Sequence, residues 1–425
     1  MPFAEALEKL YTRRRFGIRP GLERITILLD RLGNPHRLFR TVHVVGTNGK
    51  GSTSAFFSSI LSAAGYRTAL FSSPHLVNFS ERFRINGREA ANERLAPLLE
   101  AVLAKAPEET TFFEIVTALG ALFFAEEGVE IAVLEAGMGG RSDATAALTG
   151  IMTILTPVSL DHCDYLGATI AEIASEKTAI AEPGTPVVCG IQDSSVMKTI
   201  TEYCLKGSNP LYSHGVEFDA NRTPDGILSY QGIKFNFERI NPGIPGRYQT
   251  GNAALALAAA EAIELLGVTV TPQAMKTGIE EAYWPGRMEQ VSENPRIILD
   301  GAHNLAGMAA LVESLEDQKY SRLLVVIGMM QDKDLEAMLS LLAPHAAFIY
   351  AVTPMVERAV NSSQLAELCL AKGMTCEDSG SVAAGMEQAG LQASQEDLII
   401  VCGSLFVVGE AKAHLAGVEF QGIRG

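Results

Sequence analysis

The sequence lacks the features of a membrane or secreted protein. It has no uninterrupted apolar run of about 18 residues, so no transmembrane helix is expected. Its first residues, MPFAEALEKLYTRRRFGI, contain no apolar signal core and carry Glu5 and Glu8. The six cysteines (163, 189, 204, 369, 376 and 402) stand singly without CxxC spacing, which argues against a disulfide framework or a cysteine metal cluster. We therefore expect a soluble, cytoplasmic protein with reduced thiols.

Basic residues are in the minority. The chain has 34 Lys and Arg against 49 Asp and Glu, which gives a formal net charge of −15. Because nucleic-acid binders need a basic surface to displace counterions, a general nucleic-acid partner is not expected. The densest basic run, residues 13–15, is interpreted as a solvated helix face. A nucleotide can still bind such a protein where local cations and Mg²⁺ neutralise its phosphates.

The stretch from residue 41 to 76 has the parts of a phosphate-binding cradle. Residues 41–45 form a short apolar, β-branched run that predicts a buried strand, and residues 46–52, GTNGKGS, form a glycine-rich turn. From Ser52 the apolar spacing becomes helical, and Gly65 ends the helix. Free backbone N–H groups at such a helix start bind anions, and the helix dipole favours their charge.

The loop departs from the strict Walker A pattern at two positions. Val44 stands where that pattern has its first glycine, and Gly51 stands where it has Ser or Thr. The hydroxyl groups come one residue later, at Ser52 and Thr53. On the loop alone, a purely structural glycine turn stays an open alternative.

The rest of the chain predicts an α/β protein with two domains. Strands at 67–71, 130–134, 151–155 and 187–189 alternate with helices, and 211–238 predicts a small β excursion. Pro and Gly at 284–287 and a polar stretch to Pro295 predict a hinge. Strands at 296–300, 322–327, 347–352, 374–376 and 397–402 then alternate with helices again, which indicates a parallel, doubly wound sheet. We place the domains at 1–290 and 291–425, with the phosphate site in the first.

Two loops beyond predicted strands carry groups suited to nucleotide chemistry. Glu135 follows a buried strand downstream of the cradle, where a Walker B acid would stand, although an acid that merely ends a strand is the alternative. Ser73 lies in the loop after the strand at 67–71. Open α/β sheets bind ligands at such strand ends.

An ordered set of segments identifies the chain as similar to one family. These segments are GTNGKGS (46–52), FSSPHLVNFSERFRINGREA (71–90), TFFE (111–114), LEAGMGGRSDAT (134–145), LDHCDYLG (160–167), SEKTAI (175–180), PGRYQTGNAALA (245–256), WPGRME (284–289), LDGAHN (299–304), GMMQDKD (328–334) and CGSLFVVGEA (402–411). They resemble the folylpolyglutamate synthase/dihydrofolate synthase family of the Mur ligase superfamily.

The resemblance implies a fold and a reaction. An N-terminal P-loop ATPase domain and a C-terminal Rossmann-like domain would enclose the active site between them. The enzyme would be an ATP-dependent ligase that adds L-glutamate to dihydropteroate, to folate polyglutamates or to both, through an acyl phosphate. Its partners would be these small molecules, and we expect a monomer that binds neither nucleic acid nor membrane.

The resemblance also implies metal and catalytic residues. Ser73, Glu135 and His162 would bind Mg²⁺, and Lys177, carbamylated in the superfamily, would support a second ion. Lys50 would neutralise the γ-phosphate, with His162 and Lys177 assisting catalysis. Without the resemblance, His162 is interpreted as a packed or capping histidine, and Lys177 as a helix-surface lysine paired with a nearby glutamate.

Nucleotide and substrate contacts follow in the same way from the resemblance. ATP would contact the loop residues Asn48, Gly49, Lys50, Gly51, Ser52 and Thr53, and also Asn252, Arg287 and Asp300. The substrates would contact Thr111, Phe112, Phe113, Glu114, His303 and Ser404. Structural roles, an interdomain arginine for Arg287 and core packing for the phenylalanines, are the alternatives.

Two other functions compete with this hypothesis. One is a Mur ligase that acts on a UDP-muramyl peptide. The cradle begins at Gly46, and we expect no separate UDP-binding domain before it, which argues against this alternative. The other is a nucleotide-gated binding protein without ligase chemistry. Replacing Lys50 would abolish turnover in a ligase and would leave partner binding intact in a scaffold.

Overall fold

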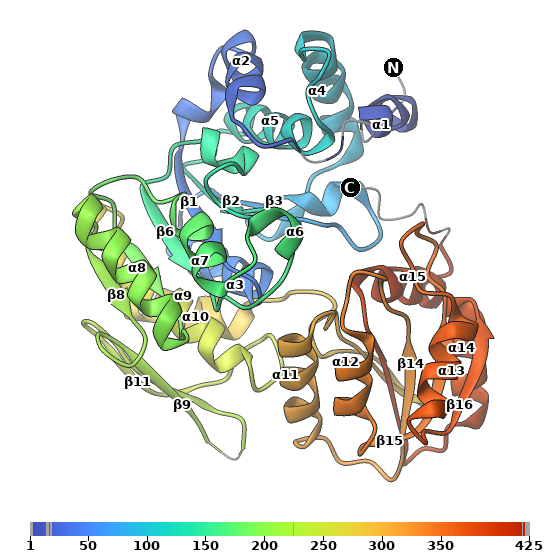
Figure 1. The fold of residues 1–425 in the computed structure, drawn as a ribbon. Coiled ribbons are helices and arrows are strands. Elements are labelled where there is room, and N and C mark those ends of the chain that lie inside the picture. Colours follow the sequence, from blue (N-terminus) through green and yellow to red (C-terminus); the bar gives the residue numbers. More distant parts are fainter. Residues whose placement is uncertain (1–2, 14–16, 18, 224, 419, 421–425) are drawn as a thin grey trace.

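The chain builds three sheets. The computed structural model describes residues 3–13, 17, 19–223, 225–418 and 420. An eight-stranded sheet and a six-stranded sheet form the centres of two units, seen in blue to green and in orange to red, and a three-stranded sheet lies beside the first unit (Figure 1). Arg14 and Arg15 of the predicted basic face lie outside the described residues.

The eight-stranded sheet places the phosphate loop at its centre. Its strand order is β4-β3-β2-β5-β1-β6-β7-β8. The strands are β1 (Arg40–Val45), β2 (Thr68–Phe71), β3 (Phe83–Ile85), β4 (Arg88–Glu89), β5 (Ile131–Glu135), β6 (Met152–Leu155), β7 (Val187–Cys189) and β8 (Leu211–Ser213). All neighbours are parallel except the pairs that β3 makes. Since β1 is flanked by β5 and β6, the loops after these strands meet at one edge of the sheet.

Helices cover both faces of this sheet. One core joins α3 (Lys50–Ala63), α9 (Gln249–Ala262) and α10 (Pro272–Glu281), where the alanines of α9 let it approach α3 closely. The other core joins α1 (Phe3–Tyr11), α2 (Glu23–Arg31), α4 (Asn92–Lys105) and α5 (Phe112–Glu126). Three helices lie near β6 and β7: α6 (Cys163–Leu166), α7 (Ile170–Thr178) and α8 (Ser194–Gly207). The 3-10 turns of this unit include η2 (Pro35–Leu38), η3 (Phe79–Arg82), η4 (Ala144–Ala147) and η5 (Ile263–Leu266).

The predicted β excursion is confirmed in part. An antiparallel sheet contains β9 (Asp219–Arg222), β10 (Leu228–Gln231) and β11 (Asn236–Ile240). The first strand of the excursion, β8, belongs instead to the large sheet, where it pairs with β7. Its short apolar run could not reveal which sheet it would join.

The second unit is the predicted parallel sheet with one antiparallel edge. Its order is β12-β13-β17-β14-β15-β16. The strands are β12 (Glu289–Glu293), β13 (Arg296–Leu299), β14 (Leu323–Ile327), β15 (Ala346–Val352), β16 (Cys376–Gly380) and β17 (Leu398–Cys402). The helices are α11 (Leu305–Leu315), α12 (Leu335–Leu342), α13 (Ser362–Ala371), α14 (Val382–Gln392) and α15 (Leu405–Ala416).

Three predictions for this unit need correction. Part of the predicted hinge is the edge strand β12, whose polar residues suit an edge exposed to water. The strand expected at 374–376 is β16, which extends to Gly380. No helix is predicted after the strand at 397–402, yet α15 begins there with Ser404 as its N-cap.

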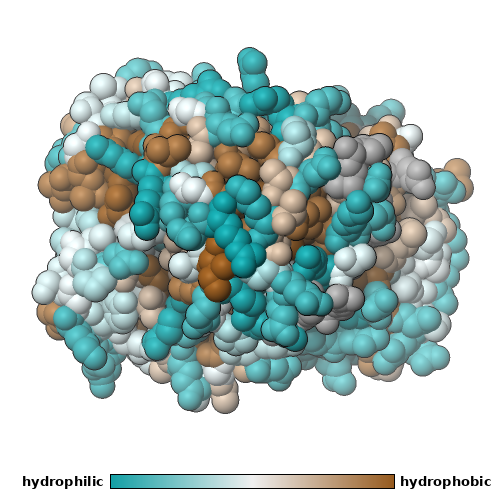
Figure 2. Space-filling model, turned by 90° about the horizontal axis from the view of Figure 1, so that it is seen from above, coloured by the Kyte–Doolittle hydropathy of each residue, from teal (hydrophilic) through white to brown (hydrophobic). Residues whose placement is uncertain are grey.

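The surface seen from above is mixed in character. Figure 2 shows hydrophobic side chains in several separate patches among hydrophilic ones. Within the described part of the chain, no helix combines the length and the apolar character needed to span a bilayer.

Candidate active site

A cavity of about 360 Å³ lies between the two units and is lined by residues of both. Many of the predicted site residues line it. From the first unit these are Asn48, Gly49, Lys50, Gly51, Ser52, Ser73, Glu135, His162, Lys177 and Asn252; from the hinge and the second unit they are Arg287, Asp300 and His303. The cavity therefore brings together groups that are up to 255 positions apart in the sequence, counted from Asn48 to His303.

Two glycines let the phosphate loop turn tightly. Gly46 has a φ of +147°, and a Cβ atom there would collide with the side chain of Thr156. Gly49 has a φ of +86°, and a Cβ atom there would lie 2.3 Å from Oδ1 of Asn252. Since L side chains rarely adopt such backbone angles, the loop requires glycine at these positions.

Gly51 explains one departure from the Walker A pattern. A Cβ atom at Gly51 would lie only 2.7 Å from Nε1 of Trp284. The Ser or Thr of the strict motif would therefore displace the tryptophan from the start of α3. The position after Lys50 is glycine because the hinge packs against it.

The hydroxyls that follow Gly51 belong to a buried hydrogen-bond network beneath the loop. Gln249 donates from Nε2 to Oγ of Ser52 at 3.1 Å, and Asn252 donates to Oε1 of Gln249 at 2.9 Å. Thr53 donates to Oδ1 of Asn252 at 3.5 Å. Thr53 is fully buried and does not line the cavity, so its observed contact supports the loop from below.

Two lysines converge on one carbonyl of the loop. Lys177 donates from Nζ to the carbonyl of Gly46 at 2.8 Å, and Lys50 donates to the same carbonyl at 3.3 Å and to that of Thr47 at 3.0 Å. Burial and the charge of Lys50 lower the pKa of Lys177 to about 7. The alternative of a helix-surface lysine is wrong, because Lys177 is 4% exposed.

Glu135 and Ser73 lie next to each other at the ends of β5 and β2. The backbone N–H of Ser73 donates to Oε2 of Glu135 at 3.3 Å. Burial raises the pKa of Glu135, while Lys50 and Ser73 oppose the rise. A buried carboxylate beside a hydroxyl fits Mg²⁺, which takes one or two protein oxygens and completes its shell with water and phosphate.

His162 lines the cavity from the start of α6. It has a φ of +52° and stands as the N-cap of α6. Imidazole is an uncommon ligand for Mg²⁺, so its fit to this ion is poorer than that of Glu135. Across the described residues, no three His, Cys, Asp or Glu side chains gather as a metal-binding group.

The residue before His162 links the two units. Asp161 accepts a hydrogen bond from Lys333 at 2.7 Å, and both side chains are about nine-tenths buried. Burial alone would raise the pKa of Asp161, but the hydrogen bond from Lys333 and the charge of His162 hold it below its usual value. Asn304 exchanges amide hydrogen bonds with Asn48 at 3.0 and 3.2 Å and donates to Asp161 at 3.2 Å.

Asp300 occupies a fixed position at the end of β13. It accepts hydrogen bonds from the hydroxyl of Tyr248 at 2.7 Å and from the backbone N–H groups of Met288 and Ala302, both at 2.9 Å. Burial raises the pKa of Asp300, and Arg287 opposes the rise. His303 is bonded through Nδ1 to the carbonyl of Gly301 at 2.8 Å, and burial lowers its pKa to about 4, so the ring is neutral near pH 7.

The TFFE segment starts α5 and stands apart from the cavity wall. Thr111 and Glu114 form a capping box, and Glu114 also pairs with Arg24 at 3.1 Å. Phe112 is buried in the core, whereas Phe113 is half-buried and packs against Gly137, which does line the cavity. Of the four, Phe113 is thus the one placed nearest to a ligand. Ser404 also does not line the cavity, because it is buried as the N-cap of α15.

Sequence reasoning missed several functional candidates. Tyr248, Asp161, Asn304 and Lys333 make the contacts above, and Tyr248 and Asp161 also line the cavity. All four stand inside segments quoted for the family resemblance. Their place in these segments could have marked them as candidates, but the sequence does not show which side chains contact each other across the two units.

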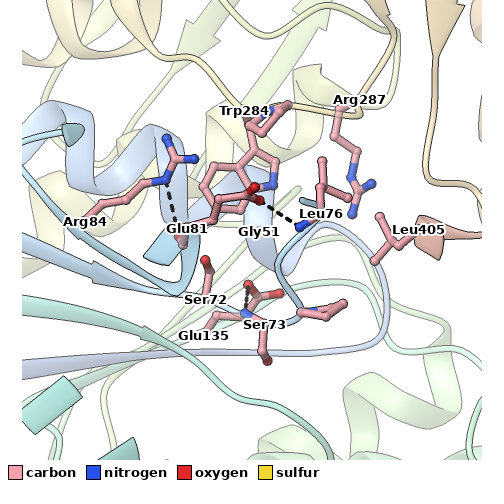
Figure 3. A pocket seen from close by; sticks show the side chains of 12 residues that line it. Gly51, Ser72, Ser73, Leu76, Glu81, Arg84, Glu135, Trp284, Arg287 and Leu405 are labelled. Atoms are coloured by element: carbon pink, nitrogen blue, oxygen red, sulfur yellow. Dashed lines mark hydrogen bonds between the residues drawn. The ribbon is translucent and has the colours of Figure 1, made fainter. Parts of the chain in front are cut away.

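A smaller pocket of about 30 Å³ opens beside the cavity, and we name it the annex (Figure 3). It shares Gly51, Ser73, Pro74, Glu135, Arg287 and Leu405 with the cavity and adds Ser72, Leu76, Glu81, Arg84, Trp284 and Pro285. The annex therefore joins the cavity at the Ser73 and Glu135 pair.

Comparison with known sequences finds one family over nearly the whole chain. Residues 44–260 match the Mur ligase middle domain, and residues 286–405 match the Mur ligase glutamate ligase domain. The chain is 32% identical to the dihydrofolate synthase/folylpolyglutamate synthase of Bacillus subtilis, across 97% of this chain and 99% of that protein. It is 34% identical to a probable bifunctional folylpolyglutamate synthase/dihydropteroate synthase of Haloferax volcanii, and spans about half (50%) of that protein's length.

Solved structures agree with the sequences. Escherichia coli FolC in complex with DHPP and ADP superposes with a TM-score of 0.89 at 31% identity, over 98% of both chains. A bifunctional folylpolyglutamate synthase/dihydrofolate synthase with Mn, AMPPNP and L-glutamate bound superposes with a TM-score of 0.87 at 30% identity, also over 98% of both chains.

Proposed function

The chain belongs to the Mur ligase superfamily and to its folylpolyglutamate synthase/dihydrofolate synthase family, and from this premise we propose that it joins L-glutamate to a pteroyl carboxylate at the expense of ATP. The acceptors are dihydropteroate and tetrahydrofolate with its polyglutamates. The products are the new amide, ADP and phosphate.

The reaction needs the acceptor to be activated first. A free carboxylate is a poor acyl donor because oxide is a poor leaving group. One carboxylate oxygen attacks the γ-phosphorus of ATP, the bond from that phosphorus to the β-bridging oxygen breaks, and ADP leaves. The amine of L-glutamate then attacks the acyl carbon of the acyl phosphate, loses a proton, and expels phosphate. The first step requires neutralisation of phosphate charge with the attacking and leaving oxygens in line.

The observation that carries this proposal is the composition of the cavity wall. The phosphate loop with Lys50 lies on one side, Ser73 and Glu135 lie at the adjacent strand ends, and Arg287 and Asp300 approach from the second unit. The loop amides and Lys50 suit the phosphates, Arg287 suits a further anionic oxygen, and Asp300 suits a ribose hydroxyl. A binding protein without phosphoryl transfer would need no carboxylate beside the γ-phosphate end.

Ser73 and Glu135 are the residues that best fit Mg²⁺, with His162 as a third candidate. When bound, the metal would supply charge neutralisation at the phosphate oxygens. The relative with Mn bound supports a divalent ion in this family. We propose a second ion next to Lys177 after the lysine has reacted with carbon dioxide. The neutral amine attacks the carbon of CO₂ and releases one proton, which turns the neutral amine into a carbamate anion.

The remaining substrate contacts are assigned by position. Phe113 would contact the pterin side through the wall at Gly137, and His303 would face the incoming glutamate. Residues 1–290 would act as the ATP-binding domain and residues 291–425 as the glutamate-ligase domain. A monomer in the cytoplasm fits the acidic composition and the six free cysteines.

The experiment is ADP release measured with dihydropteroate, tetrahydrofolate and methylene-tetrahydrofolate, each with and without L-glutamate. We expect glutamate-dependent release with at least one pteroyl acceptor. Release with a UDP-muramyl peptide alone would establish the cell-wall ligase instead. No ADP release with any acceptor, together with nucleotide binding that survives Lys50→Ala, would favour a binding protein.

A further inference from the structure

The annex has an arginine at its far end. Arg84, on β3, lines the annex, and its side chain is 9% exposed. Its guanidinium lies over the ring of Trp284 at 5.4 Å from the centroid. This stacking holds the planar cation in place, because the electron-rich face of an indole attracts it. The annex thus contains a cation held on a rigid support (Figure 3).

The existing partners of Arg84 leave part of its donor set for a ligand. Nε donates to the carbonyl of Glu81 at 3.4 Å, and Nη2 donates to Oε1 of Glu89 at 2.9 Å. The side chain of Glu89 is 40% exposed, so solvent screens this ion pair. Among the described residues, Arg84 donates these two hydrogen bonds, and neither of them uses Nη1.

Glu81 and Glu135 both line the annex, and the carboxylate of Glu81 has partners other than Arg84. The carboxylate of Glu81 accepts hydrogen bonds from three backbone N–H groups of its own loop: Leu76 at 2.7 Å, Val77 at 2.9 Å and Asn78 at 2.7 Å. Its oxygens therefore serve as the cap of that loop. Arg287 stands at the opposite side of the annex, so a second guanidinium faces the same small volume.

The position of the annex connects it to the reaction. Ser73 and Glu135, the residues proposed to hold the metal at the γ-phosphate, line both the annex and the cavity, so the opening between the two spaces lies near this pair. Leu76 and Leu405 supply apolar surface to the wall of the annex. A molecule that reacts at the opening and carries a second carboxylate a few carbon atoms away would place that carboxylate in the annex.

From this arrangement we infer that the annex is a carboxylate-binding subsite and that Arg84 binds the α-carboxylate of a glutamyl group. This inference rests on the proposed function. In a glutamyl group, three carbon atoms separate the α-carboxylate from the γ-carboxylate. Arginine suits the role because its fork of donors matches a carboxylate and keeps its charge.

Two substrates can supply this group. One is the glutamyl tail of tetrahydrofolate, whose γ-carboxylate reacts. The other is the incoming L-glutamate, whose amine reacts. Dihydropteroate separates them, because its single carboxylate is the one that is activated. If Arg84 binds the glutamyl tail, it should affect activity with tetrahydrofolate and leave activity with dihydropteroate unchanged. If it binds L-glutamate, it should affect activity with both acceptors equally.

The test uses Arg84→Gln and Arg84→Lys in the full chain, with Arg88→Gln as the matched control. Arg88 is exposed on the neighbouring strand of the same hairpin and does not line the annex. ADP release is measured with dihydropteroate and with tetrahydrofolate while L-glutamate is varied. Melting temperatures show whether each variant is folded.

Removing a charge-assisted hydrogen bond should cost about 10- to 100-fold in kcat/KM, and Arg84→Lys should recover part of it. A loss confined to tetrahydrofolate as acceptor assigns the tail. A rise of the KM for L-glutamate with both acceptors assigns the co-substrate. Folded Arg84→Gln protein with kinetic constants within twofold of Arg88→Gln would overturn the inference.

A binding measurement separates this inference from the proposed function. Trp284 is the single tryptophan of the chain, so its fluorescence reports directly on the annex. With a non-hydrolysable ATP analogue and Mg²⁺ present, L-glutamate is titrated, and binding of tetrahydrofolate is measured by calorimetry. Saturable binding that weakens in Arg84→Gln supports the subsite even if wild-type protein shows no turnover. Binding of both ligands that is unchanged in Arg84→Gln overturns it.

Discussion

Lys50 and Lys177 donate to the same acceptor, the backbone carbonyl of Gly46, at 3.3 and 2.8 Å. Two ammonium groups this close repel each other, and Lys177 is also buried. Both effects favour the neutral form of Lys177, so the structure prepares one lysine of the pair as a neutral amine near pH 7. A neutral amine is the form that reacts with carbon dioxide.

The first prediction concerns carbamylation of Lys177. Its pKa is lowered from 10.5 to about 7, so the reactive neutral amine increases as pH rises from 6 to 8. Activity at limiting bicarbonate should rise across this range, and depletion of bicarbonate should lower it. The carbamate is observed directly by carbon NMR with labelled bicarbonate. Activity that is independent of bicarbonate, with no carbamate signal, would contradict the prediction.

The same lysine gives a stability prediction for protein free of carbon dioxide and metal. Between pH 7 and 10.5 the unfolded chain keeps the proton of Lys177 while the folded chain has lost it. The free energy of unfolding should therefore increase as the pH rises through this window. Lys177→Met should reduce that slope in urea unfolding curves. An identical slope in the two proteins would show that the folded pKa is not lowered.

The second prediction concerns Lys50. Lys50→Ala should lower kcat by about 100- to 1000-fold, because the variant loses charge stabilisation at the transferred phosphate. Folding should be little affected, since the hydrogen bonds of Lys50 are to two carbonyls of its own loop. Steady-state ADP release and a melting curve check both parts. Turnover that is retained in Lys50→Ala would contradict a role for Lys50 at the transferred phosphate.

The third prediction concerns the contact between Gly51 and Trp284. Gly51→Ala should displace the indole, because the new Cβ would lie 2.7 Å from its Nε1. We expect a shifted tryptophan emission spectrum, weaker ATP binding and a loss of about 1–3 kcal/mol in the free energy of unfolding. Gly251→Ala is the control, since nothing lies within 4 Å of a Cβ atom there. Equal behaviour of both variants would refute the packing explanation for this loop.

The fourth prediction concerns Tyr248 as a positioning residue for Asp300. Tyr248→Phe removes a 2.7 Å hydrogen bond to a buried carboxylate, which should weaken ATP binding about tenfold. The KM for L-glutamate should change little, so the split between the two substrates distinguishes positioning from general damage. Tyr203→Phe is the control, because that hydroxyl donates to the carbonyl of Ala181 at 2.9 Å and does not line the cavity. Similar ATP affinities in the two variants would exclude the role.

Local patterns predicted most elements of this fold. The apolar run 187–189 and the helical spacing that starts at Ser52 coincide with β7 and α3, because a buried strand or a buried helix is encoded by neighbouring residues. The polar edge strand β12 and the start of α15 were missed. An edge strand needs little apolar sequence, and the periodicity of α15 is weak because most of its residues are buried.

The site was less predictable than the fold. The phosphate loop and Glu135 follow from their positions after strands, which the sequence reveals. The burial of Lys177 does not follow from the sequence, because the glutamates near it on the same helix suggest an ion pair at the surface. The contacts of Asp161 with Lys333 join residues 172 positions apart, and no local pattern encodes such a pair. Burial and long-range pairing depend on how the two sheets face each other.

The proposed reaction depends on activation of the pteroyl carboxylate by phosphoryl transfer before the amide forms. The most direct measurement uses an acceptor whose carboxylate oxygens carry a heavy isotope, with ATP, Mg²⁺ and L-glutamate, followed by mass analysis of the phosphate released. One heavy oxygen should appear in each phosphate formed with dihydropteroate or tetrahydrofolate, because the attacking carboxylate oxygen leaves with the phosphate. Amide formation with unlabelled phosphate would contradict it.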